Sequence, residues 1–373
     1  MSCFEEEVSP VVIDYGTYSI KAGLANQTEP SVEVRNLVGK SKRINIFATE
    51  GDVYVGNEVL KCASRFKIIQ PIQNGIIVNE PSFDAITDHI FWKELNVYSS
   101  AQPVVVIKPS QSPLEEKEEF LCNTFFGNFD VPSLSIRDSA ITALFSVGRT
   151  TGVIVDSGHA ITKIVAIYEG KVIPESTIIV PLAGDHLTEH MVRILSGEDS
   201  YYETRAGKEA IRTMKEKACF LAEDYDQEFQ NRLKEKNLME TFELPDGQSI
   251  SVTEEIAQCP ELLFNPSLLD GRCKALQYLI EDCIMACNEE VRDALWYNIV
   301  LSGGNSMFEG FGERVYSEIK KLAPEGTKVR IICGGRREYQ PWKGGSILAK
   351  LSSFSQACIT KQAYYESGSS IID

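Results

Sequence analysis

The amino-acid sequence predicts an α/β protein made of two similar domains, and three observations support this fold class. Short runs of branched apolar residues alternate with stretches of helical periodicity, as in layered α/β folds. The segment VVIDYGTYSIKAG at 11–23 returns in altered form as VIVDSGHAITKIV at 153–165. No Pro/Ser-rich linker separates the halves, so the repeat indicates two duplicated domains joined by compact crossovers rather than a tether.

Each copy of the repeat predicts a strand, a tight turn and a second strand. Three branched apolar residues precede Asp14 and Asp156, and a glycine two positions later permits the turn. The same kind of apolar run predicts two further strands at 104–107 and 299–301.

Helices are expected between these strands. The segment 115–126 carries its acids in the first turns, where the helix dipole favours them. Within 207–225 the apolar residues recur at helical spacing, at Ile211, Met214, Ala218 and Leu221. The charged Lys215 and Glu216 therefore lie on a helix.

Composition excludes several functional classes. The 53 acidic and 37 basic residues give a formal charge of −16, so the protein's field repels nucleic acid and anionic lipid. No apolar run reaches membrane-spanning length, and the N-terminus lacks the apolar stretch of a secretion signal. Ten cysteines without a C-x-x-C pair indicate reduced thiols. We expect Cys283 and Cys287 in the core and His186 and His190 at the surface, with no zinc site at either pair.

The repeated segment has the chemistry of a phosphate site. An aspartate at the end of a strand lies beside a turn whose N–H groups bind anions, and a divalent cation between carboxylate and phosphate would relieve their repulsion. Two such hairpins could hold one polyphosphate with its Mg²⁺. A single D-x-G is often only a capped turn, but two copies, each with a lysine seven positions after the aspartate, favour a nucleotide site.

A third segment, NIVLSGGNSMFEG at 298–310, is a strand that runs into Gly303 and Gly304. Without side chains there, a flat ring or a ribose could approach the backbone, although a Gly-Gly pair is more often just a turn. The chain has no P-loop motif and no G-x-G-x-x-G after a strand, so both of those nucleotide-binding solutions are disfavoured.

At this point the sequence resembles the actin family along essentially its whole length. The similarity is carried by the two phosphate segments and by GRTTGVIVDSG, IYEGKVIPES, PLAGDHLT, KEKACFLAEDY, ELPDGQSI, CPELLFNPSLL, VLSGGNSM, WKGGSILAKLSSF and ITKQAYYESGSSII. The resemblance implies an actin-like ATPase fold: two α/β domains, four subdomains in all, around a nucleotide cleft. The first domain would be 1–146 plus 340–373, with a small subdomain at about 36–70, and the second 147–339, with a small subdomain at about 183–271.

The resemblance also implies ATP or ADP as the ligand, with Mg²⁺ or Ca²⁺. Asp14 and Asp156 would act on the metal through bound water, and Lys21 would contact phosphate oxygens. The expected nucleotide-binding residues are Gly16, Thr17, Tyr18, Lys21, Asp156, Ser157, Gly158, Gly184, Arg212, Lys215, Glu216, Gly303, Gly304, Met307 and Phe308.

The departures from the family pattern concern hydrolysis. Ser139 replaces the glutamine that orients the attacking water, and Lys163 replaces the histidine that completes the hydrogen-bond network of that water. Because serine is too short for this task, we expect slow or absent ATP hydrolysis, while Lys163 could itself bind phosphate.

Other departures change the surroundings of the nucleotide. Tyr18 adds bulk to the first loop, and the second loop has His159 for an aspartate and Ala160 for a glycine. Glu338 replaces a lysine on the adenine side, and Asn74 stands where the family carries an often methylated histidine.

The resulting hypothesis is an ATP-binding cytoskeletal protein of the cytoplasm that forms filaments with itself. The alternative is an actin-related subunit of a larger complex, dynactin-like or chromatin-remodelling, which would admit the nucleus. A cleft of Phe145, Leu348 and Leu351, together with Gly148 and Phe354, would bind actin-binding proteins, whereas the filament loop at 39–54 is two residues shorter than in the family. The third hypothesis, a phosphotransferase, ranks last because this sequence has no substrate-pocket motif beyond the nucleotide site.

Overall fold

The computed structural model describes residues 8–41, 53–61, 63–108, 114–196, 200–234, 239–243, 249–269, 271 and 273–368. The chain divides into two compact units, which we describe separately. Unit 1 comprises residues 1–149 and 339–373, and unit 2 comprises residues 150–338. The loop at 39–54 lies largely outside the described residues, as does the chain end around Ile372.

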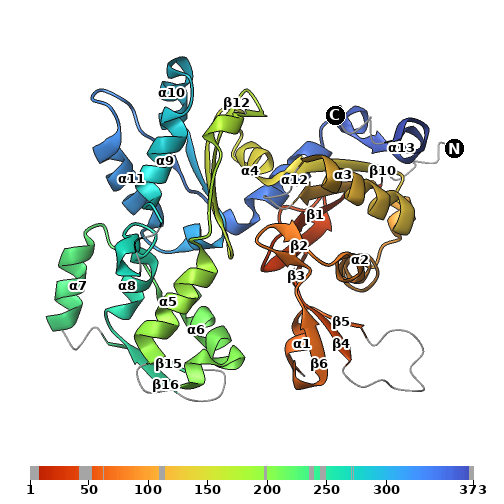
Figure 1. Ribbon diagram of the computed structural model, residues 1–373. Coiled ribbons are helices and arrows are strands. Elements are labelled where there is room, and N and C mark those ends of the chain that lie inside the picture. The colour runs from red at the N-terminus through yellow and green to blue at the C-terminus, as the bar shows by residue number, and fades with distance from the viewer. Residues whose placement is uncertain are drawn as a thin grey trace. The chain divides into compact units, whose positions relative to one another are not determined.

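Unit 1 is built on a six-stranded sheet of order β19-β10-β9-β1-β2-β3 (Figure 1). Strand β1 pairs in parallel with β9, which pairs in parallel with β10, whereas β2 and β3 continue the sheet in antiparallel fashion. Every residue of β1 and β9 is buried, as expected for central strands covered on both faces. The strands are β1 Val11–Tyr15, β2 Ser19–Leu24, β3 Val32–Arg35, β9 Val104–Lys108, β10 Ser133–Asp138 and β19 Ile359–Thr360.

Alternating residues of β1 divide between the two faces of this sheet. Val11 and Ile13 pack in one cluster with aromatic residues such as Phe83 and Phe125, and Val12 packs in a second cluster with Trp342. The helical elements of unit 1 are α1 Asn57–Lys61, η1 Ala63–Arg65, α2 Glu80–His89, η2 Ile90–Glu94, η3 Ser99–Ala101, α3 Leu114–Cys122, η4 Asn123–Asn128, α4 Ser139–Ser146, η10 Arg337–Tyr339, α12 Gln340–Ala349, η11 Phe354–Ala357 and α13 Lys361–Ser367.

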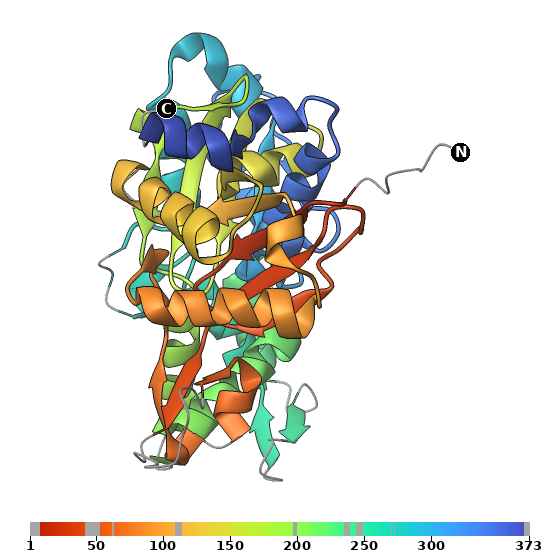
Figure 2. The ribbon, with the colours of Figure 1, turned by 90° about the vertical axis from the view of Figure 1, so that its right-hand side faces the viewer.

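Two helices of unit 1 continue as π-helices. Figure 2 shows α2 and its continuation η2 as one long helix (orange). The helix predicted over 115–126 is α3 followed by the π-helical segment η4, so the expected acid-rich helix is present but changes its hydrogen-bond pattern at Asn123.

A smaller part of unit 1 holds two further sheets. Strands β4 Val38–Ser41, β5 Val53–Val55 and β6 Phe66–Ile69 form a three-stranded antiparallel sheet, and β7 Ile72–Gln73 pairs with β8 Ile76–Ile77 in a short hairpin. Asn74 and Gly75, in the turn of that hairpin, both have positive φ.

Unit 2 repeats the central arrangement of unit 1. Its sheet has the order β13-β12-β11-β17-β18, with β14 also paired to β12; β11 is antiparallel to β12 and parallel to β17. The strands are β11 Gly152–Ser157, β12 Thr162–Tyr168, β13 Lys171–Val172, β14 Ile178–Val180, β17 Ile299–Ser302 and β18 Ile331–Ile332, and a separate hairpin joins β15 Glu240–Glu243 to β16 Ser249–Val252. The predicted α/β class and the repeated hairpin are confirmed.

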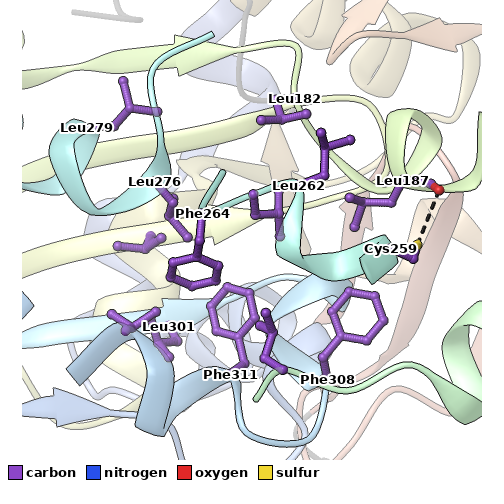
Figure 3. Close-up of a cluster of buried hydrophobic side chains, with 14 of the residues drawn as sticks. Leu182, Leu187, Cys259, Leu262, Phe264, Leu276, Leu279, Leu301, Phe308 and Phe311 are labelled. Atoms are coloured by element: carbon purple, nitrogen blue, oxygen red, sulfur yellow. Dashed lines mark hydrogen bonds between the residues drawn. The ribbon is translucent and has the colours of Figure 1, made fainter. Parts of the chain in front are cut away.

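The helices of unit 2 enclose an apolar core. Phe264 and Phe311, labelled in Figure 3, meet edge to face. Their ring centroids are 5.9 Å apart. Cys283 and Cys287 are buried in the same cluster, as predicted. The helical elements are η5 Pro174–Ser176, α5 Gly184–Ser196, η6 Ser200–Glu203, α6 Arg205–Ala218, α7 Tyr225–Lys234, α8 Glu255–Glu261, η8 Pro266–Leu268, α9 Leu276–Met285, α10 Glu289–Trp296, η9 Gly304–Met307 and α11 Phe311–Leu322.

Two predictions for unit 2 need correction. The helix expected over 207–225 begins at Arg205 and ends at Ala218, because Cys219 adopts an extended backbone conformation there. His190 is buried rather than at the surface, and burial lowers the pKa of its imidazole. Among the described residues, no helix is long and apolar enough to cross a membrane.

Candidate functional site: two phosphate hairpins

The first hairpin joins β1 to β2 and places Asp14 at the carboxyl end of a central strand. Asp14 is buried and lies opposite Lys21 in the antiparallel register. A methyl group at Gly16 would lie 2.6 Å from the Ser19 carbonyl oxygen, so the turn closes too tightly for a larger residue. The ends of parallel strands are where α/β sheets bind ligands, and this hairpin occupies such an end.

The side-chain amides of Asn36 and Gln70 hold the turn of the first hairpin from outside. The carbonyl oxygen of Thr17 accepts from Asn36 Nδ2 and from Gln70 Nε2, both at 2.8 Å, and the Thr17 hydroxyl accepts from the Gly75 N–H at 3.0 Å. Asn36 is fully buried and also donates to the Ile72 carbonyl oxygen at 2.7 Å. The turn of the first hairpin is therefore fixed to the neighbouring β7–β8 hairpin.

The Tyr18 ring at this turn packs against the side chain of Arg35. The Arg35 guanidinium lies 3.8 Å from the centroid of the Tyr18 ring, a cation–π arrangement. The bulk that sequence comparison expected at this position is thus packed against the last residue of β3.

The second hairpin joins β11 to β12 in unit 2. Asp156 lies opposite Lys163 and beside Ser302 of the parallel strand β17. Gly303 follows β17 with φ of +85°, and a methyl group on it would lie 2.6 Å from Asp156 Oδ1. The glycine is needed both for its backbone conformation and for its close contact with the hairpin.

A buried hydrogen-bond network connects this hairpin to α5, α6 and η9. Asn305 Nδ2 donates to Ser157 Oγ at 3.0 Å and to the Gly158 carbonyl oxygen at 2.8 Å. The N–H of Gly184 donates to that same carbonyl at 3.0 Å, and Lys215 Nζ donates to the Gly184 carbonyl oxygen at 2.7 Å. These five residues, four of them predicted site residues, therefore form one connected group.

Lys215 is an unusual member because its ammonium is buried. Burial lowers the pKa of Lys215, since the charged form is desolvated. The neighbouring Arg212 forms ion pairs with Glu209 and Glu216 on the same helix, α6. In this structure the Lys215 ammonium supports the backbone at the start of α5, and its contact with a nucleotide stays a prediction.

The remaining residues predicted for the nucleoside side differ in exposure. Met307 is 40% exposed, whereas Phe308 is buried. A methyl group at Gly304 would meet no heavy atom within 4 Å, so the space beside this glycine is open. His159 Nε2 lies 3.8 Å from Asp185 Oδ1, and the Asp185 N–H donates to the His159 carbonyl oxygen at 2.7 Å.

The two residues that replace the family's water-positioning pair belong to different units. Ser139 is the first residue of α4, directly after the cap Asp138, and is buried. Lys163 is a buried residue of β12. Their roles in hydrolysis stay predictions.

Both turns retain backbone donors. Within the described residues, the N–H groups of Gly16, Thr17 and Ala160 donate to no protein acceptor. Such turn amides bind anions, and each turn lies beside a strand-end carboxylate that can hold the water shell of a divalent cation. Among the residues that the structure describes, no group of three or more His, Cys, Asp or Glu side chains is placed to hold a metal ion directly. The roles of Asp14 and Asp156 toward a metal stay predictions.

The predicted partner surface lies wholly in unit 1, on α4 and α12. These helices touch closely, because a methyl group at Gly344 would lie 1.7 Å from the Thr142 carbonyl oxygen. Phe145 and Leu348 are partly exposed, and Leu351 is 49% exposed. An apolar surface is therefore present at the predicted position, while its partner is not identified by the structure.

Asn36 and Asn305 were missed by sequence reasoning. Asn305 lies within the segment 298–310 that was singled out for its glycines, but buried carboxamide donors have no sequence signature of their own.

The family model described as actin matches residues 5–373. The match covers almost the entire sequence, and the fold agrees with it: two α/β units, each with a hairpin beside a parallel strand. The chain belongs to the actin family.

Proposed function

We propose that this chain binds ATP or ADP together with a divalent cation, and hydrolyses ATP slowly or not at all. Proteins of the actin family bind a nucleotide and a cation. The observation that carries the proposal for this chain is the pair of hairpins, each with a strand-end aspartate and turn N–H groups that lack a protein acceptor.

Each residue type has a defined task in this proposal. The N–H groups of Thr17 and Ala160 would donate to phosphate oxygens, and the Lys21 ammonium would neutralise phosphate charge. Asp14 and Asp156 would orient water molecules in the shell of Mg²⁺ or Ca²⁺. The bound cation supplies charge neutralisation of the polyphosphate, which the two carboxylates alone would repel.

Slow hydrolysis is proposed because the side chains at two positions cannot orient water as the family does. Ser139 has a short hydroxyl arm, and Lys163 has only donors and cannot accept a proton from water while charged. Both residues are buried.

Two measurements test this function. The nucleotide that co-purifies with the protein is expected to be ATP or ADP; protein that binds neither on titration would refute the binding proposal. Phosphate release from Mg-ATP is expected to be slow in the wild type. In the double variant S139Q/K163H the rate of phosphate release should increase, up to the roughly 100-fold gain typical of a positioned proton-transfer group. A wild-type rate equal to that of a polymerising actin would refute slow hydrolysis.

For assembly we propose self-association into filaments in the cytoplasm, with a stoichiometric subunit of a larger complex as the alternative. The partly exposed Phe145, Leu348 and Leu351 support a partner surface in both cases. Sedimentation in polymerising salt separates the two, because a filament pellets and a stoichiometric subunit stays in solution.

A further inference from the structure

Asn305 is a buried side chain that connects the second hairpin to the neighbouring strand. It lies on η9, directly after β17, and is 6% exposed. Its amide nitrogen donates to Ser157 Oγ and to the Gly158 carbonyl oxygen. Both donor hydrogens of one carboxamide are thus used on the hairpin that carries Asp156.

The atoms that Asn305 holds are those that set the shape of the turn. The Gly158 N–H donates to the Ile161 carbonyl oxygen at 3.0 Å and closes the turn. Ser157 Oγ shares a 2.9 Å hydrogen bond with Thr162 Oγ1, which in turn donates to the Leu182 carbonyl oxygen at 2.6 Å. Both ends of the turn are therefore fixed by hydrogen bonds, and Asn305 supplies the bonds that reach it from η9.

The position of Asn305 also separates two parts of the predicted site. Gly303 and Gly304 precede it on the nucleoside side, whereas its amide reaches the phosphate hairpin. Asn305 donates to Ser157 and Gly158 of the hairpin. Through these bonds it can set the direction of the Ala160 N–H without contacting a nucleotide.

We propose that Asn305 is a positioning residue for the phosphates of the bound nucleotide. This inference rests on the proposed function. The Asn305 amide fixes the Gly158 carbonyl oxygen by a hydrogen bond. It thereby keeps the turn in the conformation in which the Ala160 N–H meets a phosphate oxygen. Its loss should weaken recognition of the phosphates and leave recognition of the nucleoside intact.

The test compares a ligand with phosphates and one without. The full chain, stripped of nucleotide, is titrated calorimetrically with Mg-ATP and with adenosine, as wild type and as Asn305→Ala. We expect the affinity for Mg-ATP to fall about tenfold or more, the size of loss common when a supporting hydrogen bond behind a ligand site is removed. The affinity for adenosine should not change.

Ser306→Ala is the matched control. Ser306 is buried on the same turn, but its hydroxyl donates to the Gly303 carbonyl oxygen at 2.7 Å and does not reach the hairpin. A general loosening of η9 would therefore weaken both ligands in both variants, whereas positioning predicts a selective loss of Mg-ATP affinity in Asn305→Ala alone.

The possible outcomes are distinguishable. A variant that binds Mg-ATP as tightly as wild type, or that loses both ligands equally, overturns the inference and leaves the proposed function standing. A wild-type chain that binds neither ligand overturns the proposed function, and the inference with it. Where Asn305→Ala does not yield folded protein, Asn305→Ser, which keeps a donor on a shorter arm, is titrated in its place with the same criteria.

Discussion

Replacing Gly303 by alanine tests whether close backbone packing holds the second hairpin. With φ of +85° and ψ of 161°, Gly303 has a backbone conformation that essentially only glycine adopts, and an L side chain there costs about 1–3 kcal/mol. A methyl group there would also lie 2.3 Å from the Ser157 carbonyl oxygen, and relieving such an overlap costs about 1–3 kcal/mol. The free energy of opening the hairpin should therefore fall by about 2–6 kcal/mol in Gly303→Ala.

Hydrogen exchange followed by mass spectrometry measures this effect locally. Exchange in peptides over β11 and β12 should accelerate by about 30-fold or more, because each 1.4 kcal/mol corresponds to about a factor of ten. A peptide over β1 in unit 1 serves as an internal reference that should not change. Gly304→Ala is the control, since a methyl group at Gly304 meets no heavy atom within 4 Å. Equal exchange in the two variants would refute the packing argument.

Three further predictions concern stability and reactivity. Arg314→Met leaves Glu261, now bound by Arg314 at 2.8 and 2.9 Å, without its partner in the core; unfolding should be easier by about 3–5 kcal/mol. Burial raises the pKa of Glu261, and a buried carboxyl without its cation takes up a proton more readily than an exposed one. The loss of unfolding free energy in Arg314→Met should therefore shrink as the pH falls from 8 to 5. A loss that denaturant titrations find independent of pH would count against this cause. Gly344→Ala should separate α4 from α12 and lower the thermal midpoint, because its methyl group would overlap the Thr142 carbonyl; an unchanged midpoint in circular dichroism would be the contrary result. Burial raises the thiol pKa of Cys122 and of Cys283 to about 12, so neither should react with iodoacetamide at pH 8 before unfolding, which peptide mapping can check.

The fold class could be predicted because the strands that define it contain uninterrupted apolar runs. The runs at 11–13 and 153–155 have no polar alternation, which indicates strands covered on both faces. The same kind of run predicted strands at 104–107 and 299–301, where β9 and β17 lie; the structure adds that each pairs in parallel with the first strand of a hairpin.

Details that depend on side-chain partners could not be predicted in the same way. His190 was expected at the surface, but it lies on the buried side of α5. The predicted helix over 207–225 was extended too far because Leu221 continued the apolar spacing, although the backbone leaves the helix at Cys219. Helical periodicity reports which residues are buried, and burial continues beyond the end of a helix.

The two hairpins are supported by the same kind of hydrogen bond, although the sequence repeat does not include the residues that make it. In each unit a buried asparagine donates its amide to a carbonyl oxygen of the turn: Asn36 to Thr17, and Asn305 to Gly158. A carboxamide suits this task because it is neutral and has two donor hydrogens, whereas an aspartate would repel the carbonyl. The carbonyl oxygens are thereby satisfied by protein donors, which leaves the N–H groups of Thr17 and Ala160 available to an anion.

Asn36 follows its hairpin closely in the chain, whereas Asn305 lies on η9, far from its own hairpin in the sequence. Asn36 stands 22 positions after Asp14 and Asn305 stands 149 positions after Asp156, so the two asparagines do not occupy matching positions of the repeat. Their equivalence arises from hydrogen-bond chemistry: a turn that presents N–H groups to a ligand needs a donor behind its carbonyl oxygens. Wherever the chain supplies that donor, the hairpin gains the same preorganised form.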